Sequence, residues 1–168
     1  MDLTALYEED FHAWSLHQAQ VLRRLAAAGL PLPNDLDLEH VAEEIEDLGS
    51  EQRFAVESNL LQALAHLIKL VALPADQAVP HWTKEADAFL LNASRRWRPS
   101  MRRAIDEAVL WDDACRLATR ALAADGLPVP VLPRESPLSI EDLVLRGADP
   151  VDLAGRPAAA MAKGNPVG

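Results

Sequence analysis

The chain of 168 residues is long enough for one domain with a sizeable core, and its 49% hydrophobic and 25% charged content is ordinary for a soluble globular protein. The net charge of −10 argues against nucleic acid as the main partner, and the single cysteine, Cys115, excludes an internal disulfide. No apolar run is long enough to cross a membrane, and the N-terminal residues lack the basic region of a secretory signal, so we expect a cytoplasmic protein without a membrane partner.

The first predicted element is a helix from about Leu6 to Ala28. Asp2 or Thr4 could cap its start, and Gly29 ends it. Residues at spacings of three and four predict one buried, largely aromatic face made of Tyr7, Phe11, Trp14, Gln18, Val21 and Leu25.

The second predicted element is one very long helix from Leu38 to Leu73, with Asp35 or Asp37 as its N-cap. Its first half is acidic and its second half is nearly all apolar, which predicts that it runs from the edge of a bundle into its centre. Gly49 costs about 1 kcal/mol relative to alanine, but one stripe of side chains continues through it. We therefore expect an unbroken helix, with Gly49 where a neighbouring helix approaches closely.

A third helix is predicted from about Trp82 to Trp97 and a fourth from Ser100 to Ala124. They are separated at Pro99, because the residue before a proline is pushed out of the α region. A single kinked helix is the alternative. Five arginines near this junction indicate either a solvated helix end or a docking patch for an acidic surface: Arg95, Arg96, Arg98, Arg102 and Arg103.

Four prolines after Gly126 predict an extended segment, and the capping sequence that begins at Ser139 predicts a short helix over Ile140 to Arg146. The composition from Pro150 onward predicts a mobile tail. The sequence thus predicts an all-α fold, a mostly antiparallel four-helix bundle with one very long helix, a short C-terminal helix and an extended tail. We expect a single bundle domain over residues 1–148 and a mobile tail over 149–168.

The sequence gives little support for a metal site or for a catalytic nucleophile. His40, Glu43, Glu44 and Asp47 share one face of the long helix, but no matching set of ligands occurs on the other helices. Cys115 has no nearby histidine in sequence, and there is no glycine-rich phosphate loop. We therefore expect no bound metal and no cofactor.

Polar residues on or beside the apolar stripes need an explanation, because buried polar groups must be hydrogen-bonded or paired. One interpretation is a network that fixes the register of the first two predicted helices. The other is a polar pocket between them, although for His66 alone a satisfied core histidine is the default. These candidates, which we expect to be at least partly buried and partly in mutual contact, are Asp10, Gln18, Glu43, His66 and Lys69.

Several short motifs resemble, in their order and spacing, a bacterial family, domain of unknown function twenty-nine. Tyr7–Trp14 followed by Gln18-Ala19 resembles its opening, Glu43–Gly49 its central acidic signature and His66–Lys69 the end of its long helix. Pro99–Arg102 is similar to its Pro-Ser-Leu-Arg turn, and Ser136–Ser139 resembles the segment before its last short helix. The resemblance covers about residues 7–146 and implies an all-helical fold without an assigned biochemistry.

The leading hypothesis is an interaction or regulatory module that self-associates or binds another protein. Four tryptophans, an acidic region and an arginine cluster are suitable interface material. The alternative is a small enzyme with an acid/base or metal pocket between the first two predicted helices. A third and weaker hypothesis is a nucleic-acid-associated factor that uses the arginine cluster.

Overall fold

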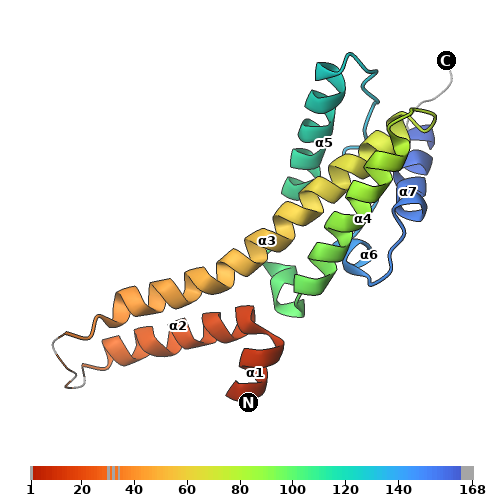
Figure 1. The fold of residues 1–168 in the computed structure, drawn as a ribbon. Helices are drawn as coiled ribbons and strands as arrows, with labels where there is room; N and C mark the ends of the chain where they lie inside the picture. Colours follow the sequence, from red (N-terminus) through yellow and green to blue (C-terminus); the bar gives the residue numbers. More distant parts are fainter. Residues whose placement is uncertain (1, 30, 32, 34, 164–168) are drawn as a thin grey trace. The chain divides into compact units, whose positions relative to one another are not determined.

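The computed structural model describes residues 2–29, 31, 33 and 35–163. Its helices are α1 (Leu3–Glu9), α2 (Phe11–Ala27), α3 (Leu38–Ala72), α4 (Val79–Arg96), the 3-10 turn η1 (Pro99–Arg103), α5 (Glu107–Ala124), α6 (Ile140–Val144) and α7 (Pro150–Lys163) (Figure 1). These described residues contain no strand, so the predicted all-α class with one very long helix is confirmed.

The chain divides into two compact units, each of which is described by itself. Unit 1 comprises Met1–Ala55 and Arg98–Ala104, and therefore contains α1, α2, the first part of α3 and η1. Unit 2 comprises Val56–Trp97 and Ile105–Gly168. The expectation of one folding domain over residues 1–148 stays a prediction, because compact units need not unfold separately.

The predicted first helix is interrupted at Asp10. The backbone of Asp10 leaves the helical conformation, and its carboxylate accepts a hydrogen bond from the N–H of Ala13 at 2.9 Å, which caps α2. Asp2 caps α1 in the predicted way by accepting bonds from the N–H groups of Thr4 and Ala5. Glu8, Glu9 and Asp10 also fit a continuous helix, so the sequence pattern did not reveal Asp10 as the cap of a second helix.

In unit 1, α2 and the first part of α3 form an antiparallel hairpin (Figure 1). The two helices approach very closely at Gly49, because a Cβ built there would overlap the Ser15 hydroxyl and lie 2.9 Å from Ser15 Cβ. An ion pair of 2.6 Å between Arg23 and Glu46 also joins them. α3 runs through Gly49 without a break, and Asp37 caps its start, so both predictions are confirmed.

The side of α2 that is buried is not the one predicted. The buried residues of α2 are His12, Ser15 and Ala19. They lie one position along the helix from the predicted stripe, which is half-buried from Phe11 to Leu25 and exposed at Tyr7. The predicted face is therefore only partly buried. Hydrophobicity alone suggested that face, whereas the close approach at Gly49 requires small side chains on α2.

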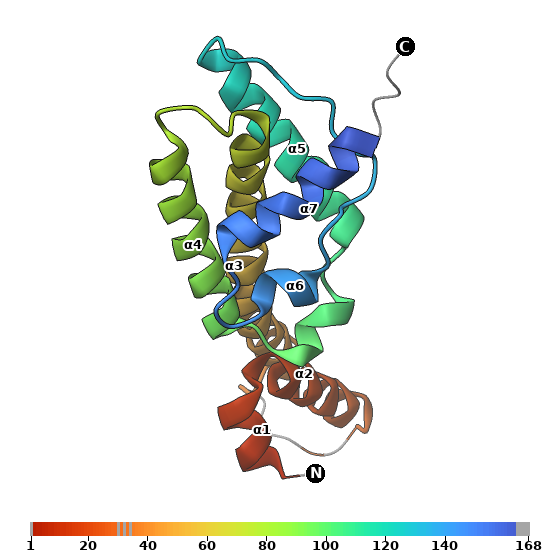
Figure 2. The ribbon, with the colours of Figure 1, turned by 90° about the vertical axis from the view of Figure 1, so that its right-hand side faces the viewer.

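In unit 2, the second part of α3 supplies the core, where Leu60, Leu64 and Leu67 are buried almost completely. α4 runs antiparallel beside this part of α3 and is in contact with α6 and α7, as Figures 1 and 2 show. The predicted fourth helix begins later than expected. η1 is a 3-10 turn, and Asp106 caps α5 at its start. The third and fourth predicted helices are therefore separate.

The C-terminal segment is helical where an extended tail was predicted. Residues Pro150–Lys163 form the helix α7, in which Leu153, Ala154 and Pro157 are buried, so the prediction of an extended tail was wrong for this part, while its mobility stays a prediction. Alanine is the best helix former, and an alanine-rich segment with a few apolar residues can gain stability by packing. The rest of the predicted tail, residues 164–168, lies outside the described residues.

Among the described helices, α3 is the one that is long and apolar enough to span a bilayer by length and composition alone. The core helix of a globular protein meets the same criterion, and 44% of the apolar stretch is buried within the protein. We therefore assign α3 to the core in describing the fold.

Candidate functional site

A chain of three polar side chains joins η1 to the junction of α1 and α2 in unit 1. The Ser100 hydroxyl donates a hydrogen bond to Asp10 Oδ1 at 2.7 Å, and His12 Nδ1 lies 2.9 Å from the same hydroxyl oxygen. A serine hydroxyl has one proton. With that proton directed at Asp10, the Nδ1–H of His12 must donate to Ser100 Oγ, so the order of the chain is histidine, serine, carboxylate.

This order differs from that of a serine nucleophile. In a catalytic triad, the imidazole accepts the hydroxyl proton and the carboxylate orients the imidazole. Here the carboxylate of Asp10 accepts the proton of Ser100 and also caps α2 at Ala13. The three side chains therefore hold η1 in place against α2, and these two elements are in contact.

His12 is the buried member of the chain, with 2% of its surface exposed. Burial lowers the pKa of His12 below its usual value of 6.5, while the negative charge of Asp10 opposes this shift and the positive charge of Arg53 reinforces it. The fold thus favours the neutral imidazole, which agrees with a single proton on Nδ1.

Close to Asp10 and His12 in sequence, three aromatic rings pack together, and none of them is fully buried. The ring of Tyr7 meets those of Phe11 and Trp14 edge-on at 5.5 and 4.8 Å, and the last two are stacked at 5.4 Å. Tyr7 is 51% exposed, and the other two rings are half-buried. Leu3, 43% exposed, lies one helical turn before Tyr7 on the same side of α1. We call Leu3, Tyr7, Phe11 and Trp14 the aromatic patch.

The five polar residues predicted from the sequence are divided between the units. In unit 1, Asp10 and Gln18 are half-buried, whereas Glu43 is exposed, so the expectation that Glu43 is partly buried was wrong. Glu43 lies on the outer side of α3, since Ala42 beside it faces the interior. Only Asp10 of these three enters the chain with Ser100 and His12.

In unit 2, His66 and Lys69 are half-buried. The Nδ1 of His66 is 2.8 Å from the Gln62 carbonyl oxygen, to which it donates, and its ring lies 5.7 Å from that of Phe89. Burial lowers the pKa of His66, and Lys69 adds to that effect. These contacts are those of a satisfied histidine. A common functional role for the five predicted residues stays a prediction.

Sequence reasoning missed Ser100 and His12 as partners of Asp10. Ser100 lies 90 residues from Asp10 and 88 from His12, and the helical periodicity did not reveal Asp10 as a cap. The available signal was indirect: Asp10 and His12 lie in one motif of the family resemblance and Ser100 in another, and both motifs meet in unit 1.

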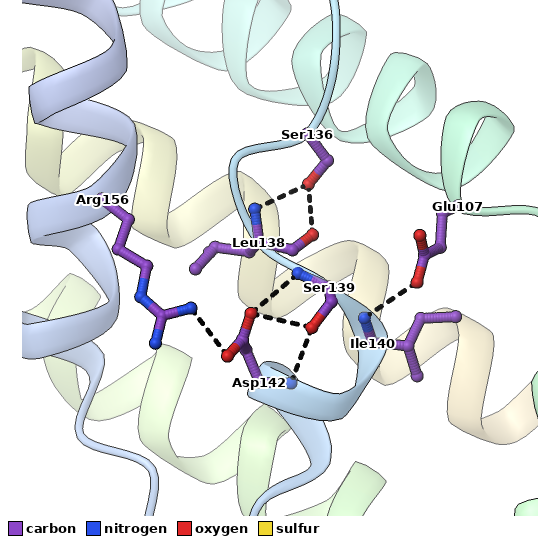
Figure 3. A network of polar contacts seen from close by, with 7 residues as sticks. All are labelled: Glu107, Ser136, Leu138, Ser139, Ile140, Asp142 and Arg156. Carbon is purple, nitrogen blue, oxygen red and sulfur yellow. Dashed lines mark hydrogen bonds and ion pairs between the residues drawn. The ribbon is translucent and has the colours of Figure 1, made fainter.

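A second polar network fixes the start of α6 in unit 2 (Figure 3). Ser139 and Asp142 form the predicted capping box, and Asp142 also pairs with Arg156 of α7 at 2.6 Å. Glu107 of α5 accepts a hydrogen bond from the Ile140 N–H at 3.1 Å. Hydrogen bonds from Ser139 and Arg156 hold the pKa of Asp142 below its usual range. This network ties α6 to α5 and α7 and is explained by that structural role.

Within the described part of the chain, no three histidine, cysteine, aspartate or glutamate side chains come together as metal ligands. His40, a candidate ligand on α3, forms an exposed local pair with Asp37 at 2.6 Å. Burial, together with the charge of Asp112, raises the pKa of Cys115 to about 11. Because the thiolate is the reactive form, this cysteine is not an activated nucleophile.

The comparisons with known proteins support the fold. The family model described as "Domain of unknown function DUF29" matches residues 6–146. Among solved structures, the chain is similar to an alpha-helical protein of unknown function from Rhodospirillum rubrum ATCC 11170. The TM-score is 0.82 and the sequence identity 30%, over 89% of this chain and 96% of that chain. No curated protein matches.

Proposed function

We propose that this chain, which belongs to the DUF29 family of unknown function, is a cytoplasmic interaction module that binds a second copy of itself. The contact we propose is the aromatic patch of unit 1. The observation that carries the proposal is a group of three packed rings of which none is buried.

Aromatic side chains are enriched at protein interfaces and supply many of their energetic hot spots. Covering the exposed half of a tyrosine removes on the order of 100 Å² of largely apolar surface, which is worth about 2 kcal/mol. The patch contains no charged residue, so two copies can pack patch against patch in a symmetric dimer without unpaired charges at the centre. Exposed Glu8 and Glu9 on α1 place like charges around it.

Sedimentation equilibrium tests this proposal directly. We expect a reversible dimer of the full chain that tightens as salt rises, because salt screens the repulsion between the acidic rims. The double variant Leu3→Ser/Tyr7→Ser should weaken association at least about tenfold, the loss expected for an interface hot spot. Val109→Ser, at a residue of α5 that is 57% exposed, is the matched control and should change nothing. A wild-type chain that stays monomeric at about 100 μM refutes the proposal.

The alternative, a small enzyme, has one observation in its favour, namely the Ser100 hydroxyl bonded to the carboxylate of Asp10. A carboxylate that accepts the proton of a hydroxyl activates that hydroxyl as a nucleophile. The position of His12 and the capping role of Asp10 favour the fastening role instead. Labelling with a fluorophosphonate probe separates the two. We expect no labelling, whereas covalent labelling that Ser100→Ala abolishes would establish a reactive serine.

A further inference from the structure

The first part of α3 carries two apolar stripes, and only one of them is buried. Leu38, Ala42 and Gly49 face the interior of the protein. Val41 and Leu48 are instead 39% and 52% exposed. They are seven residues apart, which places them on the same side of the helix. Among the described residues of unit 1, this second stripe stays exposed.

Carboxylates border the exposed stripe. Glu44 and Glu51 follow Val41 and Leu48 by three positions each, so they lie next to them along the helix. Both are exposed, as are Glu43 and Asp47 farther around the helix. None of these four carboxylates has an ion pair in the described part of the chain. We call Val41, Glu44, Leu48 and Glu51 the α3 ridge.

We propose that the α3 ridge binds a basic amphipathic helix of a partner protein. The partner would have apolar side chains at spacings of three and four on one side, with lysines or arginines beside them. The seven-residue repeat of Val41 and Leu48 matches a helix packed alongside α3. The adjoining carboxylates supply the charge that selects a basic sequence.

Charge also selects against the other occupants. The same ridge of a second copy would bring Glu44 and Glu51 against like charges, which is unfavourable at close range. Anionic membranes and nucleic acids carry the wrong charge for this surface as well. The proposal is independent of dimer formation through the aromatic patch, because the two surfaces share no residue.

The probe is a labelled synthetic helical peptide with leucines along one side and lysines on both flanks. A second peptide has the same composition in an order that spreads the leucines around the helix. Binding to the full chain is measured by fluorescence anisotropy at low and physiological salt. We expect the amphipathic peptide to bind with a micromolar dissociation constant of about 1–50 μM and the scrambled peptide to bind at least about tenfold more weakly.

Two variants with matched controls locate the binding surface. Leu48→Ser should weaken binding about tenfold or more, whereas Val109→Ser should leave it unchanged. Glu44→Gln/Glu51→Gln should weaken binding and reduce its salt dependence. Asp87→Asn/Glu135→Gln, at two exposed acids of unit 2, makes the same change in net charge and should have little effect. All six substituted residues are exposed, and equal thermal unfolding temperatures will show that folding is intact.

Three results overturn the inference. The first is no binding of the amphipathic peptide up to about 100 μM. The second is equal binding of the scrambled peptide, or equal losses in the two charge variants, since either would show a general attraction to an acidic protein. The third is a wild-type dimer that Leu48→Ser dissociates, because the ridge would then be occupied by a second copy. Dimer formation that depends on Leu3 and Tyr7 is a separate outcome.

Discussion

Replacing Gly49 with alanine tests the closest contact in unit 1. An added Cβ at this position would overlap the Ser15 hydroxyl and lie 2.9 Å from Ser15 Cβ. The hydroxyl could rotate away, although it would then lose its 2.9 Å bond to the His12 carbonyl. The Cβ of Ser15 cannot rotate away because it is attached to the backbone of α2. The two helices must therefore separate.

Two opposing terms set the magnitude. Alanine is better than glycine in a helix interior by about 1 kcal/mol. Overpacking a tight contact costs about 1–3 kcal/mol, and losing the buried hydroxyl bond costs about 1 kcal/mol more. We therefore expect Gly49→Ala to lower the free energy of unfolding by about 1–3 kcal/mol. This sign is opposite to that expected for most exposed helical glycines.

Urea unfolding followed by circular dichroism measures this change. Gly155→Ala in α7 is the matched control, because no atom lies within 4 Å of a Cβ built there, and it should be neutral or stabilising. The double variant Ser15→Gly/Gly49→Ala moves the small residue to the other helix and should recover part of the loss. A Gly49→Ala chain as stable as the wild type would show that the close approach of α2 and α3 is misplaced.

Two further predictions concern the Asp10–Ser100–His12 chain. Asp10→Ala removes both the cap of α2 and the acceptor for Ser100, so it should destabilise the fold by about 1–3 kcal/mol. Glu43→Ala, at an exposed acid of α3, should stay within about 0.5 kcal/mol of the wild type, and equal effects in urea unfolding would contradict the assigned contacts. The second prediction concerns pH. Because the pKa of His12 is below 6.5 in the fold, the unfolded chain binds more protons as the pH falls through 6.5, and stability should fall with it. His12→Gln should reduce this loss between about pH 7 and about pH 5, while the lowered pKa of His66 contributes a loss of the same sign that remains in the variant. An unchanged pH profile for His12→Gln would show that His12 is not the titrating group.

Features that depend on local sequence were predictable. The length and continuity of α3, its cap at Asp37 and the capping box at Ser139 follow from periodicity and from residues that are close in sequence. The role of Gly49 was also predictable, because a glycine on an otherwise continuous stripe indicates close approach of another helix. These signals require no knowledge of which helices meet.

Features that depend on contacts between distant segments were not predictable in the same way. The pairing of Asp10 and His12 with Ser100 spans 90 and 88 residues, and no local pattern encodes it. The helix α7 was missed because its Ala, Gly and Pro content was interpreted without the packing that buries Leu153 and Pro157. The buried face of α2 was misassigned because the prediction considered only hydrophobicity and not the short distance between α2 and α3 at Gly49.

The choice of buried face on α2 also bears on function. Full burial of a large apolar side chain stabilises a fold by about 1.5–3 kcal/mol, so a helix selected for stability alone would turn Phe11 and Trp14 inward. Here α2 instead buries His12, Ser15 and Ala19 against the close approach at Gly49. Phe11 and Trp14 are consequently only half-buried, and they pack with the exposed ring of Tyr7. Departures from the most stable arrangement are expected at functional sites, and the incomplete burial of these rings is the feature on which the proposed contact rests.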